Sequence, residues 1–181
     1  DPADMKNTSA NRPADSPLLV ESYNGLGSER VHTTKLHNSW LVGGSGLYST
    51  TRDLFKWVDA MNSRKILKDE KFDYLLNNPV DLGRNNDFYG YGMEMKTLWG
   101  EKVYRHDGAT VGTISDFLYF PEHELTMVIY INHVHNVNAI GYSISMRKQI
   151  IQQVSGIFFD HDIPLTLAKQ STEGTSLKQY V

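Results

Sequence analysis

Four apolar runs joined by short connections lie between Asp87 and His133, and this feature constrains the fold most. The runs are DFYGYGMEMKTLWG, KVYRH, GTISDFLYF and LTMVIYINH. Consecutive strands can pair through short turns only when they are antiparallel, because parallel strands need a crossover of about a dozen residues or more. The sequence therefore predicts an antiparallel meander. Its first run alternates apolar side chains as far as a turn at Trp99–Gly100: Tyr89, Tyr91, Met93 and Met95.

Helical patterns stand on both sides of these runs. Apolar residues recur at i, i+3, i+4 and i+7 in Leu54, Trp57, Val58 and Met61, which is typical of a helix buried on one face. Ser49 or Thr50 can cap that helix, and Asp53 falls in its first turn, where a carboxylate favours the helix dipole. A second short helix is expected over 68–79, ending at Asn-Asn-Pro. A long closing helix is expected over 138–159, with one face formed by Ile140, Ile144, Ile151 and Val154.

These patterns divide the chain into four segments. Residues 1–40 are loop-rich, with a possible short strand at Leu18–Tyr23, and residues 41–80 are helical. Residues 81–163 form the antiparallel sheet and the C-terminal helix, and residues 164–181 form a polar tail. Helices and antiparallel strands that occupy separate stretches of sequence indicate an α+β fold.

Composition excludes several classes of function. The chain has 181 residues, a net charge of -3 and no cysteine. A nearly balanced charge without a basic block argues against a nucleic-acid partner. The lack of cysteine removes disulfides, a thiol nucleophile and a cysteine-based zinc site. No apolar run approaches the roughly 20 residues of a membrane span, so we expect no membrane crossing within this chain.

The order and spacing of four further motifs carry a family resemblance. GGSGLYSTTRDLFKW, YGYGMEM, RHDGATVG and LYFPEHELTMVIYIN together resemble the serine β-lactamase and penicillin-binding-protein-like hydrolases, over about residues 40–155. The groups most similar are the class C β-lactamases, D-aminopeptidases, DD-peptidases and related esterases. The resemblance implies a peptide, D-amino-acid amide or ester as substrate, an acyl-enzyme intermediate and no cofactor or metal. It also favours a cell-envelope, periplasmic or secreted location.

By this resemblance, His106-Asp107-Gly108 matches the family's His-x-Gly triplet. The Ala109 N–H would then donate to the oxyanion of a tetrahedral intermediate. Gly108 lacks a side chain, so an acyl group could approach the backbone closely. His106 would bind substrate or join the proton network of the nucleophile. Asp107 replaces the usual Thr or Ser and is expected to repel an anionic substrate, and Asn132 is expected at the rim of the pocket.

The family's other two catalytic motifs are expected ahead of the glycine-rich turn, and neither stands there. Ser145-Met-Arg-Lys148 spells Ser-x-x-Lys, but it lies in the closing helix, after the His-x-Gly triplet. Tyr130-Ile-Asn132 spells Tyr-x-Asn within the last apolar run, where strand alternation explains it. The chain is therefore interpreted as the C-terminal half of a catalytic domain, inactive by itself. Such a half would need a companion segment or would self-associate, because its sheet would have an uncovered edge.

Two other interpretations stay open. The chain could be a non-catalytic binding module that keeps the sheet and has lost the chemistry. It could also be a metal hydrolase, because His133 and His135 at i, i+2 can share a strand face and bind a metal ion with Asp or Glu.

Overall fold

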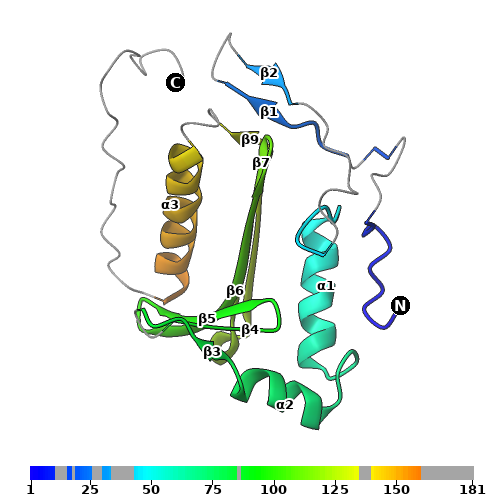
Figure 1. Cartoon of the computed structure of the whole chain (residues 1–181), viewed down its shortest axis with the longest axis vertical. Helices are drawn as coiled ribbons and strands as arrows, with labels where there is room; N and C mark the ends of the chain where they lie inside the picture. Colours follow the sequence, from blue (N-terminus) through cyan, green and yellow to red (C-terminus); the bar gives the residue numbers. More distant parts are fainter. Residues whose placement is uncertain are drawn as a thin grey trace.

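The computed structural model describes residues 1–10, 16–17, 19–25, 30–33, 43–84, 87–134 and 140–159. Its centre is a six-stranded sheet with helices on both sides, α3 (Ile140–Phe159) against one face and α1 (Thr51–Asn62) against the other (Figure 1). The α+β fold expected from the sequence is therefore confirmed. Within the described residues, no helix is both long enough and apolar enough to cross a membrane.

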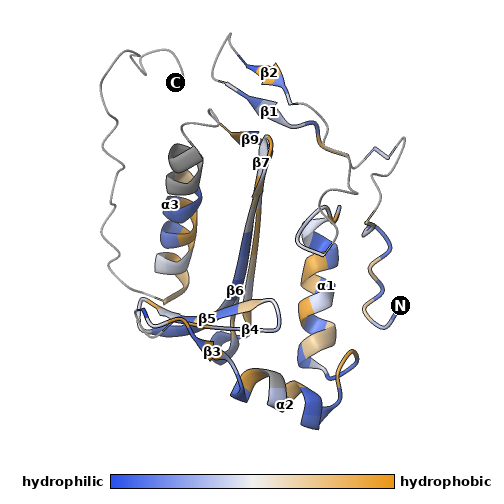
Figure 2. Ribbon diagram, in the orientation of Figure 1, coloured by the Kyte–Doolittle hydropathy of each residue, from blue (hydrophilic) through white to orange (hydrophobic). Residues whose placement is uncertain are grey.

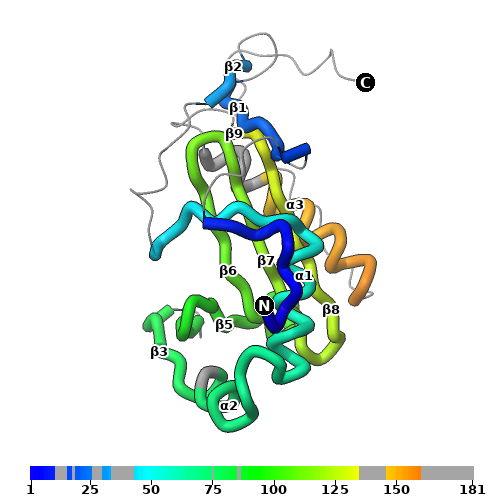
Figure 3. Tube along the Cα trace, turned by 90° about the vertical axis from the view of Figure 1, so that its right-hand side faces the viewer, coloured from blue at the N-terminus to red at the C-terminus, as the bar shows by residue number. Residues whose placement is uncertain are grey.

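The strands follow one another in space in the same order as in the sequence, and every neighbouring pair is antiparallel. The three longest strands lie next to one another in the side view (Figure 3), and Figure 1 shows the sheet between the two helices. The meander is thus confirmed, and it is longer than the four strands expected. Its members are β3 (Val80–Asp81), β4 (Phe88–Gly90), β5 (Met93–Leu98), β6 (Glu101–Thr110), β7 (Thr113–Phe120) and β8 (Leu125–Ile131).

The first apolar run contains a turn that its alternation does not reveal. Gly90 pairs with Met93 across Tyr91 and Gly92, so the run forms the hairpin β4–β5 in place of one strand. Tyr91 has φ 54° and Gly92 has φ 82°, the positive values that suit the twist of a two-residue hairpin. The predicted turn at Trp99–Gly100 is confirmed and has the same geometry, with φ 53° and 87°.

The main core lies between the sheet and α3. Val103, Leu118 and Phe120 are completely buried, and Met127 and Ile151 complete the cluster. These residues come from three adjacent strands and one helix, so burying them joins segments far apart in sequence. Each large apolar side chain buried in this way contributes about 1.5–3 kcal/mol relative to an exposed one. Ile151 and Val154 of the predicted apolar face of α3 contact this core, whereas the side chains of residues 140 and 144 lie outside the description.

The opposite face of the sheet contacts α1. Trp57 meets Phe117 edge-on, with ring centroids 5.7 Å apart, and Val58 is buried. Hydrophilic and hydrophobic residues alternate around the turns of this helix (Figure 2). Thr50 is confirmed as the N-cap, because its side chain accepts a hydrogen bond from the Asp53 N–H.

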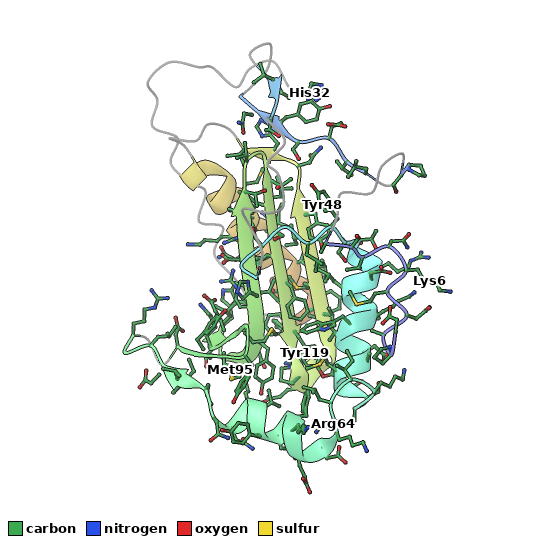
Figure 4. All side chains as sticks on the ribbon, turned by 45° about the vertical axis from the view of Figure 1, so that its right-hand side comes forward. Lys6, His32, Tyr48, Arg64, Met95 and Tyr119 are labelled. Atoms are coloured by element: carbon green, nitrogen blue, oxygen red, sulfur yellow. The ribbon has the colours of Figure 1, made fainter. Side chains whose placement is uncertain are left out.

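Asp53 was predicted only as a carboxylate in the first turn of α1, but it also binds the N-terminal segment. Its carboxylate is completely buried and accepts hydrogen bonds from the Asn7 N–H at 2.7 Å and the Thr8 hydroxyl at 2.9 Å. Lys56, one turn further on, donates to the Asp4 carbonyl at 2.7 Å. The first eight residues are therefore tied along α1, and Figure 4 shows Lys6 beside this helix.

The remaining elements are small. Helix α2 (Asp69–Asn77) ends before Asn78-Pro79, as predicted. A second sheet orders β2 (Val31–His32), β1 (Tyr23–Asn24) and β9 (His133–Val134). The short strand expected at Leu18–Tyr23 is wrong, because strand pairing begins only at Tyr23 and residues 19–22 are irregular; Leu18 itself lies outside the described residues.

Candidate active site

The backbone of β6 has an unpaired margin. The β5–β6 pairing ends at Glu94 with Arg105, whereas the β6–β7 pairing continues from Tyr104 to Thr110. In antiparallel strands, alternate residues direct both backbone groups to the same neighbour. The closing pairs of the two hairpins fix this alternation, and by it the backbone groups of Arg105 point toward β5. The amides of Asp107 and Ala109, two and four residues further on, therefore point to the same side as those of Arg105. No described strand residue pairs with them there, which leaves the Ala109 N–H outside the ladder.

This margin lines a cavity of about 1210 Å³. His106, Asp107, Gly108 and Ala109 all contribute to its wall, and His106 and Ala109 are exposed. Across from them, Trp57 of α1 and Thr8 of the N-terminal segment also line it. The structure thus brings the four residues of the His-x-Gly segment to one hollow between the sheet and the segments that cover it.

His106 has one neighbour that distinguishes it. The Tyr89 hydroxyl lies 3.1 Å from Nε2 of His106, and the two rings meet edge-on with centroids 6.0 Å apart. Tyr89 comes from β4, two strands away from β6. Glu94 of the intervening strand β5 is not a partner of this imidazole, because it pairs with Lys96 at 2.9 Å and Arg105 at 3.7 Å.

Asp107 is directed to the α3 side of the sheet, into a network of charges. Arg147 of α3 contacts Asp107 at 2.7 Å and Asp116 at 3.1 Å. Arg105 contacts the same two carboxylates, at 3.2 and 2.7 Å. Burial acts to raise the pKa of Asp107, but Arg147 and Arg105 outweigh it and hold that pKa below its usual value. Because two arginines neutralise this carboxylate, the geometry gives no support to the expected repulsion of an anionic substrate.

Asp116 is the deepest member of this network. Its side chain is completely buried in β7, and Arg147 is only 4% exposed. Burial raises the pKa of Asp116, against the opposing effect of the two arginines. A buried charge needs a partner, because an unpaired one costs several kcal/mol. The network therefore couples α3 to β6, which carries the His-x-Gly segment, and to the neighbouring strand β7.

Gly108 lies opposite Ser115 in the β6–β7 ladder. A Cβ atom at this position would lie 3.0 Å from the Ser115 Oγ, closer than an ordinary van der Waals contact. The absence of a side chain leaves the backbone open on the cavity side, as close approach of a ligand requires.

The Tyr-x-Asn residues of β8 also reach the cavity. Tyr130 and Ser49 both line the wall. Burial raises the pKa of Tyr130, and a side-chain hydrogen bond from Ser49 opposes that effect. Asn132 lines the cavity as well, and its side-chain amide donates to the Glu21 carbonyl at 2.9 Å. Both residues thus connect the sheet to neighbouring segments.

The Ser-x-x-Lys residues lie on α3, on the opposite side of the sheet from α1. Lys148 is exposed, and the side chain of Ser145 lies outside the described part of the chain. The residue of this tetrapeptide that reaches the His-x-Gly segment is Arg147, through Asp107.

The two-histidine metal alternative has limited structural support. The His133 Nε2 hydrogen-bonds the Gly25 carbonyl, and His135 lies outside the described residues. In the part of the chain that is described, no three His, Cys, Asp or Glu side chains converge as a metal site would require.

Two residues that contact the His-x-Gly segment were not predicted as members of the site. The sequence predicted Tyr89 only as one of the alternating residues of the first apolar run, and Arg147 only as an inner residue of the Ser145-Met-Arg-Lys148 tetrapeptide. A signal existed for the second, because Asp116 interrupts an otherwise apolar strand and a buried acid requires a cation. No signal existed for Tyr89, because its contact with His106 depends on how three strands are placed.

Comparisons with known proteins relate this fold to several hydrolases and to a penicillin-binding protein homologue. A D-aminopeptidase from Gluconobacter oxydans (strain 621H) is 26% identical over 100 residues, covering 55% of this chain and 19% of the enzyme. The octameric penicillin-binding protein homologue from Pyrococcus abyssi superposes with a TM-score of 0.62 at 18% identity, over 74% of this chain and 32% of that one. A D-stereospecific amidohydrolase from Streptomyces sp. gives a TM-score of 0.61 at 20% identity, over 72% and 40%. This chain therefore spans well under half of each of these relatives.

The structural likenesses, at these identities, concern the fold. A family model extends the relationship to the sequence: the model named Beta-lactamase matches residues 1–144. Because that match covers most of the sequence, this chain belongs to the Beta-lactamase family.

Proposed function

We propose that this chain forms the His-x-Gly wall of a serine hydrolase active site that acts on a peptide, D-amino-acid amide or ester. The observation that carries the proposal is the unpaired margin of β6, where the Ala109 N–H faces the cavity beside His106. The names of the D-aminopeptidase and the D-stereospecific amidohydrolase support amide bonds of D-amino acids as the substrate class.

In this proposal, a serine hydroxyl attacks the substrate carbonyl while a base accepts its proton. The carbonyl oxygen becomes an oxyanion, and the Ala109 N–H donates a hydrogen bond to it as its charge develops. When the intermediate collapses, the amine or alcohol leaves with the proton and the acyl group stays on the serine. Water then hydrolyses this ester and restores the hydroxyl.

The serine and its lysine are proposed to come from a Ser-x-x-Lys motif outside these 181 residues, together with a Tyr-x-Asn motif. The small share of each relative that this chain covers supports this division. The chain by itself is then inactive, and a companion segment or self-association completes the site. The residues encoded before Asp1 provide the first check: finding neither motif there favours the non-catalytic binding module.

Replacing Ala109 by Pro tests the proposed donor directly. Proline removes the N–H, yet by the strand alternation it breaks no ladder bond at this position, and the preceding Gly108 tolerates the proline ring. In the form of the protein that includes the residues encoded before Asp1, we expect kcat to fall about 10²–10³-fold, the effect of losing one oxyanion donor. Hydrolysis is measured with D-alanine amide, a D-Ala-D-Ala peptide, nitrocefin and p-nitrophenyl acetate.

Ala109→Gly is the matched control, because it keeps the N–H and should retain most of the activity. Equal activity in the Pro and Gly variants would contradict the role given to this amide. Turnover by the 181-residue chain alone that disappears in Ser145→Ala would instead place the nucleophile in α3.

A further inference from the structure

Tyr89 and His106 form a pair that burial does not explain. Both side chains are at least one-third exposed, so the hydrophobic effect does not force them together. The ladder brings the two residues to the same level of the sheet, because Tyr89 pairs with Glu94 and Glu94 pairs with Arg105, the residue before His106. The result is a directed contact of 3.1 Å between the phenol oxygen and Nε2 of the imidazole.

The chemistry of the two groups indicates which one donates. A neutral imidazole has one N–H and one acceptor nitrogen, and its tautomer is set by the bond that one ring nitrogen makes. The tyrosine O–H is a strong donor, whereas its oxygen, conjugated with the ring, is a weak acceptor. The phenol therefore donates to Nε2, and the proton of the imidazole resides on Nδ1.

We propose that Tyr89 is a positioning residue that holds His106 in the Nδ1–H tautomer. His106 then presents a hydrogen-bond donor, and no lone pair, to a ligand in the cavity. A donor at this place matches an oxygen acceptor, such as the carbonyl or terminal carboxylate of an acyl substrate. This inference rests on the proposed function for its substrate, but the tautomer itself is independent of any activity.

The tautomer of His106 can be measured in the 181-residue chain, and the measurement does not require catalytic activity. Imidazole nitrogen chemical shifts are measured by NMR on protein labelled with ¹⁵N-histidine, at about pH 8.5, where histidine is normally neutral. His106 is assigned by its loss in His106→Asn. We expect a dominant Nδ1–H form in the wild type and a several-fold shift toward Nε2–H, the form favoured by free histidine, in Tyr89→Phe.

Tyr91→Phe is the matched control. Tyr91 is an exposed tyrosine two residues away whose ring packs against Tyr74, with centroids 6.2 Å apart, so its hydroxyl should not affect His106. An Nε2–H form in the wild type, or the same populations in wild type and Tyr89→Phe, would overturn the proposal.

A second experiment measures how the tautomer affects hydrolysis, in the form of the protein that includes the residues encoded before Asp1. Asparagine places its amide N–H₂ near the position of Nδ1, whereas glutamine extends it toward Nε2. We therefore expect His106→Asn to retain several-fold more kcat/KM than His106→Gln, and Tyr89→Phe to raise KM more than it lowers kcat. The reverse order of the two His106 variants would contradict donation from Nδ1. A complete lack of hydrolysis in the wild type would defeat the proposed function, while the NMR result would still decide the tautomer.

Discussion

His106 and Asp107 are neighbours in β6, yet their surroundings have little in common. Asp107 is held by Arg105 and Arg147 on the side of the sheet that α3 covers. His106 is exposed at the cavity and has the Tyr89 hydroxyl as its hydrogen-bond partner among the described residues. One residue is fixed by several charges, and the other is exposed with a single side-chain hydrogen bond to a described residue.

Within a single tripeptide, Asp107 is held by ion pairs, whereas His106 is exposed at the cavity. The alternation of a strand sends successive side chains to opposite faces, so a charged residue can stabilise the strand from behind while its neighbours line a site. Asp107 also lines the cavity, but its carboxylate is paired with Arg105 and Arg147 on the side of the sheet that α3 covers. The following predictions test this division in order of decreasing effect on stability.

Arg147→Met should have the largest effect. The change removes one of two cations from the completely buried Asp116 and also releases Asp107, while a long apolar side chain keeps the volume. We expect a loss of about 3 kcal/mol in the free energy of unfolding, at the low end for breaking a buried ion pair because Arg105 remains. Urea unfolding followed by circular dichroism measures it.

Lys148→Met is the control for that change, because the exposed Lys148 is adjacent on the same helix. It should alter stability by no more than about 0.5 kcal/mol. If the two variants are equally stable, the charge network does not anchor β6, and the contrast between its two faces fails.

Asp107→Asn should have a smaller and pH-dependent effect. The Asp107 carboxylate is 41% exposed, so water screens its ion pairs and we expect a loss of about 1 kcal/mol or less at neutral pH. Because its pKa is lowered in the folded protein from a reference value of 3.8, its stabilisation is present above about pH 4 and is lost as the pH falls through the folded pKa.

The measurement is the difference in unfolding free energy between wild type and Asp107→Asn at several pH values. The difference should shrink as the pH falls below 4. Asp116, whose pKa is raised, contributes with the opposite sign but is present in both proteins. A gap that stays constant down to pH 2 would show that Asp107 is not held as a charged partner.

Gly108→Ala should have the smallest effect on stability. Alanine is better than glycine by about 0.5–1 kcal/mol in regular structure, and the 3.0 Å approach to the Ser115 Oγ offsets that gain. We expect a net change within about 0.5 kcal/mol by urea unfolding, together with a clear loss of hydrolysis, since the methyl group narrows the approach to the backbone. A destabilisation as large as that of Arg147→Met would mean that Gly108 serves packing, and the double variant with Ser115→Ala would then restore stability.

The sequence predicted the elements better than their contacts. Short turns and periodicity were enough for the meander, the N-cap of α1 and the end of α2, because these depend on local preferences. Tyr91 shows where such reasoning fails: alternation treated it as one more strand residue, whereas its positive φ makes it half of a turn. A tyrosine before glycine can adopt that conformation, but nothing in the apolar pattern requires it.

The candidate site was predictable only in part. The His-x-Gly segment was found by resemblance, and the structure places all four of its residues at one cavity. The hydrogen bond from Tyr89 and the ion pairs of Arg147 join residues 17 and 40 positions apart from their partners, His106 and Asp107. Contacts at such separations follow from the packing of the strands and α3, which local sequence patterns do not encode.

The buried carboxylate of Asp53 has a practical consequence for handling this protein. Trimming the chain at residue 9, by a protease or in the choice of an expression boundary, would delete both donors that satisfy it. The remaining polypeptide would keep its helix and sheet sequences intact but lose the segment that packs along α1 and covers this carboxylate, so a shortened version should be less stable, although no secondary-structure element had been cut.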